Sequence, residues 1–157
     1  MKKISLITLL LIFGLQQVIA DGIFDRLTEK KWQGTGKLLG ASATYNMEWV
    51  KGLDDKFFIL RFQNERVVEG HELIFSAHAY YKIIDEKKVE GMWFDSRGIY
   101  FPLVGTFNTN ELVIDWGIKD TEQGRTIYRL QSSENMNVTD YVLHSGKYVQ
   151  FGSASYK

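Results

Sequence analysis

The chain of 157 residues contains no cysteine. This excludes disulfide bonds, thiolate metal sites and cysteine nucleophiles, so the fold depends on its core and on backbone hydrogen bonds. The one proline, Pro102, lies within a strand-like run, where proline indicates an edge, a bulge or a local break. The 19 lysines and arginines balance the 19 acidic residues. Because a nucleic-acid-binding protein would show a basic patch, we expect no nucleic-acid partner.

Long uncharged apolar runs are also scarce, and the one clear example lies at the N-terminus. Lys2 and Lys3 precede an apolar stretch from Ile4 to Leu15, and short residues follow up to Ala20. The stretch is shorter than the ~20 apolar residues of a membrane-spanning helix. Its layout is typical of a cleaved secretory signal, with a signal anchor as the alternative. We therefore expect a bacterial signal peptide at 1–20, a mature domain at 21–157 without a membrane span, and a secreted or periplasmic location.

The rest of the chain alternates apolar and polar residues with a period of two. The run "TYNMEW" places Tyr45, Met47 and Trp49 on one face, and the runs "KWQGTGKL", "FILRFQ", "ELIFSAHAYYKI" and "ELVIDWGI" follow the same rule. Such alternation marks strands with one buried face. Clusters of turn-forming residues separate about ten such runs at the spacing of roughly 8–12 residues that is typical of all-β domains.

Short linkers between consecutive strands favour an up-and-down antiparallel meander. Closing such a sheet removes its exposed edges, and a closed barrel of this size has room for a cavity. We therefore predict an all-β fold, a single up-and-down antiparallel β-barrel of about ten strands, with a two-sheet sandwich as the alternative. Residues 21–30 break the alternation. The spacing of Phe24 and Leu27 predicts a short helical segment there that closes one end of the barrel.

Two stretches resemble the calycin superfamily, which includes lipocalins, fatty-acid-binding proteins and the nitrobindin-like haem barrels. The first strand begins "KKWQGTG", although Lys30 stands where lipocalins have a glycine. The stretch from "YYKIIDEKK" to "VIDWG" is similar to a bacterial lipocalin-like domain family of unknown function, and the matching residues are Trp93, Asp95, Ser96, Gly98 and Gly105. The resemblance implies a barrel whose interior can hold a ligand.

The aromatic content of the chain is high, with 4 Trp, 8 Tyr and 10 Phe. A barrel has more interior than its backbone fills, and aromatic residues on the inner face would line an apolar pocket. Small inward residues (Gly34, Gly36, Ala77, Ala79) are expected to leave room in it. Arg61 is out of phase with the apolar face of its strand and is expected to point outward rather than to anchor an anionic head group. The predicted pocket residues are Tyr45, Met47, Trp49, Phe62, Phe75, Tyr81, Trp93, Phe101 and Trp116.

The tetrapeptide Asp95-Ser96-Arg97-Gly98 brings together side chains that catalytic sites use. Ser96 lacks the sequence context of a catalytic serine. Asp at the first turn position and Gly at the last instead predict a hairpin turn. Successive turns of a meander alternate between the two ends of a barrel, so this turn shares an end with the turn that follows His144. We therefore place Asp95, Arg97 and His144 at the rim of the open mouth.

The function that this pattern favours is non-catalytic binding of a small hydrophobic or amphipathic molecule, with no metal and no cofactor. Three alternatives stay open. The resemblance to nitrobindin-like domains implies a haem held by His144. Some calycin barrels act as isomerases or lyases. A barrel filled by its own side chains would instead indicate a protein-interaction module of the cell envelope.

Overall fold

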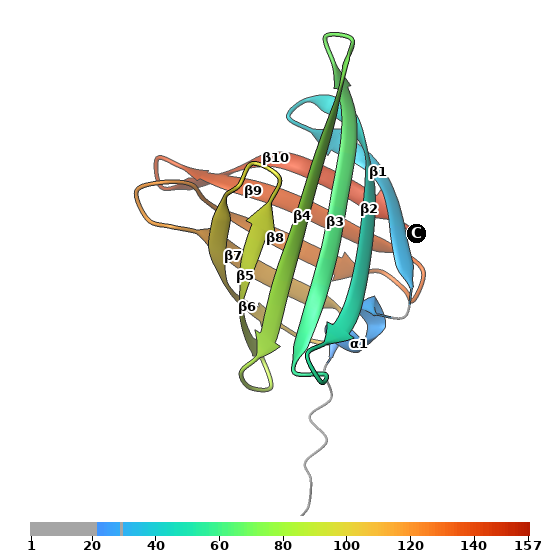
Figure 1. The fold of residues 1–157 in the computed structure, drawn as a ribbon, viewed down its shortest axis with the longest axis vertical. Coiled ribbons are helices and arrows are strands. Elements are labelled where there is room, and N and C mark those ends of the chain that lie inside the picture. The colour runs from blue at the N-terminus through green and yellow to red at the C-terminus, as the bar shows by residue number, and fades with distance from the viewer. Residues whose placement is uncertain (1–21, 29) are drawn as a thin grey trace, which may run out of the picture.

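Ten antiparallel strands form one closed barrel in the computed structural model, which describes residues 22–28 and 30–157 (Figure 1). The predicted signal peptide at 1–20 lies outside the described residues. The elements are α1 (Ile23–Leu27), β1 (Lys31–Leu38), β2 (Ala41–Gly52), β3 (Phe57–Val68), β4 (His71–Ile83), β5 (Lys88–Asp95), β6 (Tyr100–Phe107), β7 (Glu111–Gly117), β8 (Gln123–Leu130), β9 (Met136–His144) and β10 (Lys147–Tyr156). The predicted all-β barrel of about ten strands is confirmed.

The barrel closes where β1 pairs with β10, and two glycines of β1 make this pairing possible. A Cβ atom at Gly36 would lie 1.9 Å from the carbonyl oxygen of Ser153, and one at Gly34 would lie 2.6 Å from the ring of Tyr156. The two glycines therefore let neighbouring groups approach closely. The expectation that they leave room in the interior is wrong, because the Tyr156 ring and the backbone of β10 occupy that space.

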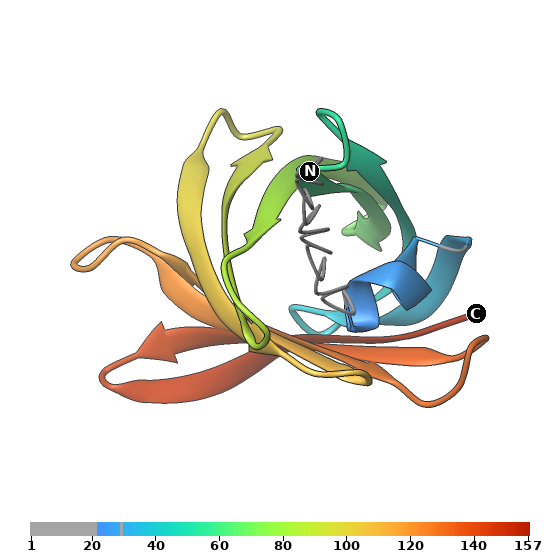
Figure 2. The same ribbon diagram turned by 90° about the horizontal axis from the view of Figure 1, so that it is seen from below.

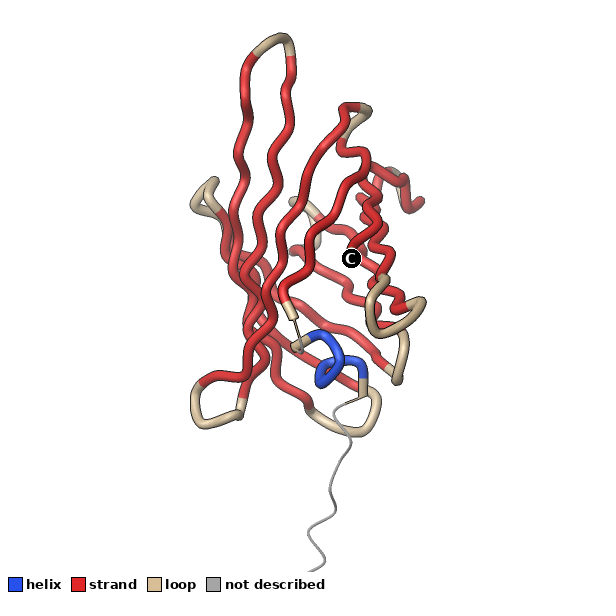
Figure 3. The backbone as a smooth tube through the Cα atoms, turned by 90° about the vertical axis from the view of Figure 1, so that its right-hand side faces the viewer, coloured by secondary structure: helices blue, strands red, loops and turns tan. Residues whose placement is uncertain are grey.

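The alternation seen in the sequence matches the inner and outer faces of the strands. Tyr45, Met47 and Trp49 of β2 are buried, and the residues between them are not. The main exception is Leu73 of β4, which is in phase with the inner face but 43% exposed. The β3–β4 hairpin rises beyond the other strands at the upper end, so its tip has no opposite wall to pack against (Figures 1 and 3).

Pro102 lies within β6, where the sequence predicts an edge, a bulge or a break. It pairs with Met92 of β5. On the other side, the pairing of β6 with β7 begins only at Leu103. Pro102 therefore stands just past the end of the β6–β7 ladder, where its missing N–H group removes no strand hydrogen bond.

The helix α1 seals the lower end of the barrel, as the sequence predicts. Ile23, Phe24 and Leu27 are fully buried. The Phe24 ring stacks on Phe58 at a centroid distance of 4.8 Å. The indole N–H of Trp32 donates a hydrogen bond to the carbonyl of Leu27. Figure 2, which views the barrel from below, shows α1 at the lower opening of the ring of strands.

The upper end carries the turns β1–β2, β3–β4, β5–β6, β7–β8 and β9–β10. The predicted turn at 95–98 is among them. The backbone N–H of Gly98 donates to the carbonyl of Asp95, and Gly98 has a φ of 78°, which an L side chain rarely adopts. Among the described residues, no helix has the length and apolar character that a membrane span requires.

Candidate functional site: an aromatic cavity with two polar groups

A cavity of about 410 Å³ occupies the upper part of the barrel, and the exposed upper turns contribute Leu39 to its lining. The volume is within the range of sites for small molecules. The barrel is therefore not filled by its own side chains, and a filled interior was the basis for expecting a protein-interaction module. Eight of the nine predicted pocket residues line the cavity: Tyr45, Met47, Phe62, Phe75, Tyr81, Trp93, Phe101 and Trp116.

Trp49 is the ninth, and the structure places it beneath the cavity rather than on its wall. Its ring packs against Phe24 of α1, against Tyr81 at 5.2 Å and against Tyr128 at 5.7 Å. Its indole nitrogen is buried and finds no acceptor among the described residues. Trp49 is in phase with Met47, but it lies further down the same strand, in the layer that joins the cavity floor to α1.

Aromatic rings form a continuous wall on the β3–β7 side of the cavity. Trp93 lies 6.0 Å from Phe62 and 6.3 Å from Phe75, measured between ring centroids. Trp116 continues the wall, 5.9 Å from Phe101 and 6.4 Å from Phe151. Such a wall suits the flat or extended apolar body of a ligand, because aromatic rings offer a large contact area in a fixed shape.

The rim residues Asp95 and Arg97 are engaged with each other. The Arg97 guanidinium donates to both carboxylate oxygens of Asp95, the shortest contact being 2.8 Å, and reaches Glu122 at 3.3 Å. The Trp93 indole also donates to Asp95. Burial acts to raise the pKa of the Asp95 carboxyl, but the hydrogen bonds from Arg97 and Trp93 outweigh it and hold this pKa below its usual value. Arg97 lines the cavity with its charge already compensated.

His144 lies at the same end of the barrel but not beside this pair. The β7–β8 hairpin stands between the β5–β6 and β9–β10 turns, and it supplies Glu122 as the neighbour of Arg97. His144 is exposed, and the lining on its strand reaches only as far as Val142. The sequence analysis placed His144 at the correct end of the barrel but could not give the separation between the β5–β6 and β9–β10 turns.

Arg66 of β3 lines the cavity near its mouth and makes no ion pair within the described part of the chain. Its one hydrogen bond is a long contact of 3.4 Å from a guanidinium nitrogen to the carbonyl of Leu38. Arg61, on the opposite face of the same strand, points outward as expected and pairs with Glu48 at 2.9 Å. Arg66 is therefore the arginine of this strand whose charge is available to a ligand.

Asp140 of β9 is a second charged group that faces the cavity. One carboxylate oxygen, Oδ1, accepts a hydrogen bond of 2.7 Å from the Thr126 hydroxyl, which accepts one from the Trp116 indole. No described group donates to the other oxygen, Oδ2. Burial raises the pKa of Asp140 from its ordinary value of 3.8 to about 6, although the Thr126 hydrogen bond opposes this.

The alternation of the sequence places both Arg66 and Asp140 on inward faces, although the predicted pocket residues did not include them. Asn64 and Arg66 continue the inward phase of Phe58, Leu60 and Phe62 along β3. Asp140 lies between Val138 and Val142, which also line the cavity. A charged residue in phase with an apolar face is the mark of a functional group, because burying a charge is costly unless it is used.

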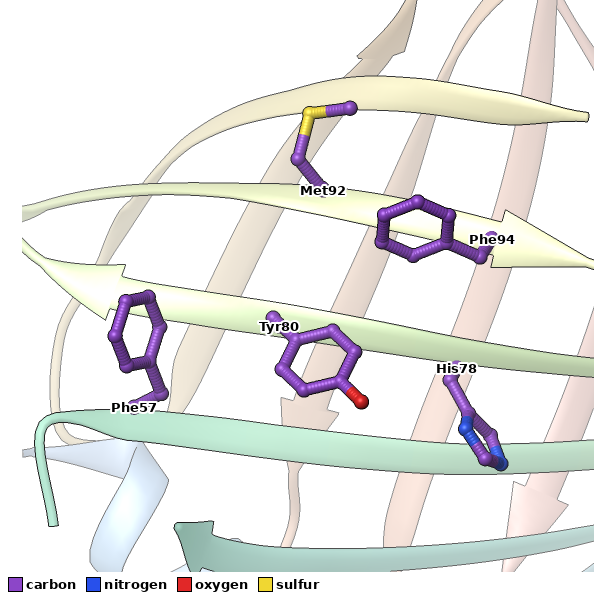
Figure 4. Close-up of a pocket in the computed structure, with 5 residues that line it drawn as sticks. All are labelled: Phe57, His78, Tyr80, Met92 and Phe94. Carbon is purple, nitrogen blue, oxygen red and sulfur yellow. The ribbon is translucent and has the colours of Figure 1, made fainter. Parts of the chain in front are cut away.

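A second hollow lies on the outer surface of β3, β4 and β5, and it is formed by Phe57, His78, Tyr80, Met92 and Phe94 (Figure 4). His78 pairs with Phe94 across neighbouring strands, and Tyr80 pairs with Met92. Figure 4 shows these five side chains spread along the three neighbouring strands. Within the described residues, no three His, Asp or Glu side chains are arranged to hold a metal ion.

Comparison with known proteins supports the fold. No protein-family model matches the chain, and no curated protein matches it. The structure is similar to that of the S-type phycobiliprotein lyase CPES from Guillardia theta, with a TM-score of 0.59 and 12% sequence identity over 85% of this chain and 88% of that one. At this identity the likeness supports the architecture alone, the closed antiparallel barrel that the ten strands of this chain form.

Proposed function

We propose that the protein is an exported, non-catalytic barrel that binds a small amphipathic molecule. The apolar body of the ligand would lie against the aromatic wall, and an acidic head group would be held by Arg66 at the mouth. The observation that carries this proposal is the cavity of about 410 Å³ whose lining includes the Arg66 guanidinium, which makes no ion pair with any described residue. A guanidinium binds a carboxylate strongly because it can donate two parallel hydrogen bonds.

One feature of the site argues against the haem alternative. No histidine occurs among the residues that line the cavity, and His144 is exposed outside it. A haem seated in the cavity would therefore lack that ligand. The structural neighbour is named as a lyase, so chemistry on the bound molecule is the outcome to test against simple binding.

The direct test is a titration of the expected mature chain, residues 21–157, with dodecanoate, measured by calorimetry and by tryptophan fluorescence, to which Trp93 and Trp116 on the cavity wall contribute. Arg66→Gln is expected to weaken dodecanoate binding about tenfold, the loss of one charge-assisted contact worth about 1.4 kcal/mol. Binding of uncharged dodecanol should not change. Arg61→Gln is the matched control, since Arg61 is on the same strand but faces outward, and it should leave both affinities unchanged.

Three outcomes would overturn the proposal. The first is the absence of binding by either compound. The second is equal weakening in the Arg66 and Arg61 variants. The third is recovery of a chemically altered ligand after incubation, which mass spectrometry would detect and which would make the protein an enzyme. Biliverdin is a useful further probe, because the name of the structural neighbour suggests a tetrapyrrole-related ligand. Export is tested separately by locating the protein in fractions of its own host.

A further inference from the structure

Asp140 is placed as a recognition group rather than as a structural one. Asp140 lines the cavity; its Oδ1 accepts a hydrogen bond from Thr126, and its Oδ2 has no donor from any described residue. A Cβ atom built at Gly152 would lie 3.0 Å from this oxygen and 3.4 Å from a methyl group of Leu38. The carbonyl of Leu38 is also the contact of Arg66. Tyr45 interacts electrostatically with both Asp140 and Arg66, so the two charged groups face the same part of the cavity, and they form no ion pair with each other.

The groups around Asp140 do not neutralise its charge. Tyr45 of β2, Tyr81 of β4, Tyr128 of β8 and Tyr156 of β10 interact with it electrostatically. Burial raises the pKa of all four phenols, that of Tyr45 to about 12, so they stay uncharged at neutral pH. Arg66 interacts with Tyr45 but makes no ion pair with Asp140. Apart from the Thr126 hydroxyl, no described group donates to this carboxylate, so a donor on a ligand would stabilise its charge.

We propose that Asp140 selects ligands that carry a hydrogen-bond-donating nitrogen, an ammonium or a ring N–H, close to the acidic head group. This proposal rests on the proposed function, because it assigns the second polar contact of the same ligand. The acid of the ligand meets Arg66, the nitrogen meets the free Oδ2 of Asp140, and the apolar remainder meets the aromatic wall. A plain fatty acid satisfies Arg66 but leaves a charged carboxylate facing its hydrocarbon chain.

Binding should depend on pH with opposite signs for the two kinds of ligand. Protonation of Asp140 removes the partner of a cationic nitrogen, so the affinity for an amine-bearing ligand falls as the pH falls. The same protonation removes a buried negative charge beside a fatty acid, so its affinity rises. The pKa of about 6 places both changes in an accessible range. The histidines are exposed and outside the lining, so their protonation does not produce this pair of effects.

The test compares dodecanoate with N-octyl-β-alanine, which has the same chain length and carboxylate but a secondary ammonium in place of one methylene. At pH 7.5 the wild-type protein is expected to bind N-octyl-β-alanine about tenfold more tightly. In Asp140→Asn the two affinities should come within about twofold of each other, and both should lose their pH dependence between pH 8.0 and 5.5. Asp115→Asn is the matched control, since Asp115 faces outward and pairs with Arg125.

The outcomes separate the two proposals. If neither compound binds the wild-type protein, the proposed function is overturned together with the selectivity. If both bind equally, or if dodecanoate binds more tightly, only the role of Asp140 is overturned. The same holds if Asp140→Asn preserves the tenfold preference. Circular dichroism of the variant checks that it is folded, and retained binding of dodecanoate shows that its cavity is intact.

Discussion

The empty protein is expected to become more stable when Asp140 is replaced by Asn. The carboxylate lies in the barrel, one of its two oxygens has no donor among the described residues, and burial raises its pKa to about 6 from an ordinary value of 3.8. Above pH 6 the folded chain therefore keeps a charge that the unfolded chain carries more favourably. Asparagine removes the charge and retains an oxygen that can accept the hydrogen bond from Thr126.

The magnitude follows from the two pKa values. They differ by about two, and each pKa unit is worth about 1.4 kcal/mol, so the charge costs up to about 3 kcal/mol at pH 7.5. Because the folded pKa is raised, the folded state binds more protons than the unfolded state between pH 3.8 and 6. The contribution of Asp140 to stability is therefore most favourable below this window and is lost as the pH rises through it. Asp140→Asn should gain about 2–3 kcal/mol at pH 7.5 and close to nothing at pH 4.

Urea unfolding followed by tryptophan fluorescence between pH 4 and 8 measures this difference directly. Other carboxylates also titrate at low pH, notably Asp95, so the quantity to compare is the variant minus the wild type at each pH. A constant difference across the range would refute the electrostatic argument, as would a less stable variant at pH 7.5. Asp115→Asn, which breaks an outer pair with Arg125, should show no gain at any pH.

Two further predictions concern the closure of the barrel. Phe24→Ala is expected to lower the free energy of unfolding by about 3–5 kcal/mol, because removing a fully buried ring that packs on Phe58 leaves a cavity between α1 and the strands. Urea unfolding measures this change, and a loss below 1 kcal/mol would contradict the sealing role of α1. Gly36→Ala is expected to prevent closure of the barrel, since its Cβ would lie 1.9 Å from the carbonyl oxygen of Ser153. The control Gly40→Ala places its Cβ within 4 Å of no atom and should cost only about 1 kcal/mol for its positive φ. Soluble yield and thermal unfolding compare the two variants, and equal stability would contradict the steric argument.

The fold could be predicted from the sequence because its physical causes are local. Alternation with a period of two assigns each strand residue to a face, and turn residues such as Gly98 mark the ends of the strands. Closure then follows from the cost of open edges in a long meander. For the same reason, eight of the nine predicted pocket residues line the cavity, since the phase of a strand decides which residues face inward.

The depth of a residue within the barrel and its neighbours across the interior were not predictable in this way. Trp49 has the same phase as Met47 but lies below the cavity, and His144 shares an end with Arg97 without adjoining it. Both depend on the tilt and register of the strands, which a single sequence does not fix. The space that Gly34 seemed to leave is taken by Tyr156, which pairs with it only in the closed barrel.

The distribution of charges distinguishes the site from the rest of the molecule. On the outer face, arginines meet carboxylates at short range, as Arg125 does with Asp115 at 2.6 Å and Arg129 with Glu111 at 2.6 Å. On the inner face, Arg66 and Asp140 both interact with Tyr45 and yet form no ion pair with each other. Two opposite charges that satisfied each other would stabilise the empty barrel. Because they do not pair, both charges stay available on the cavity lining, and a ligand that supplies both an acid and a donor nitrogen would contact them together.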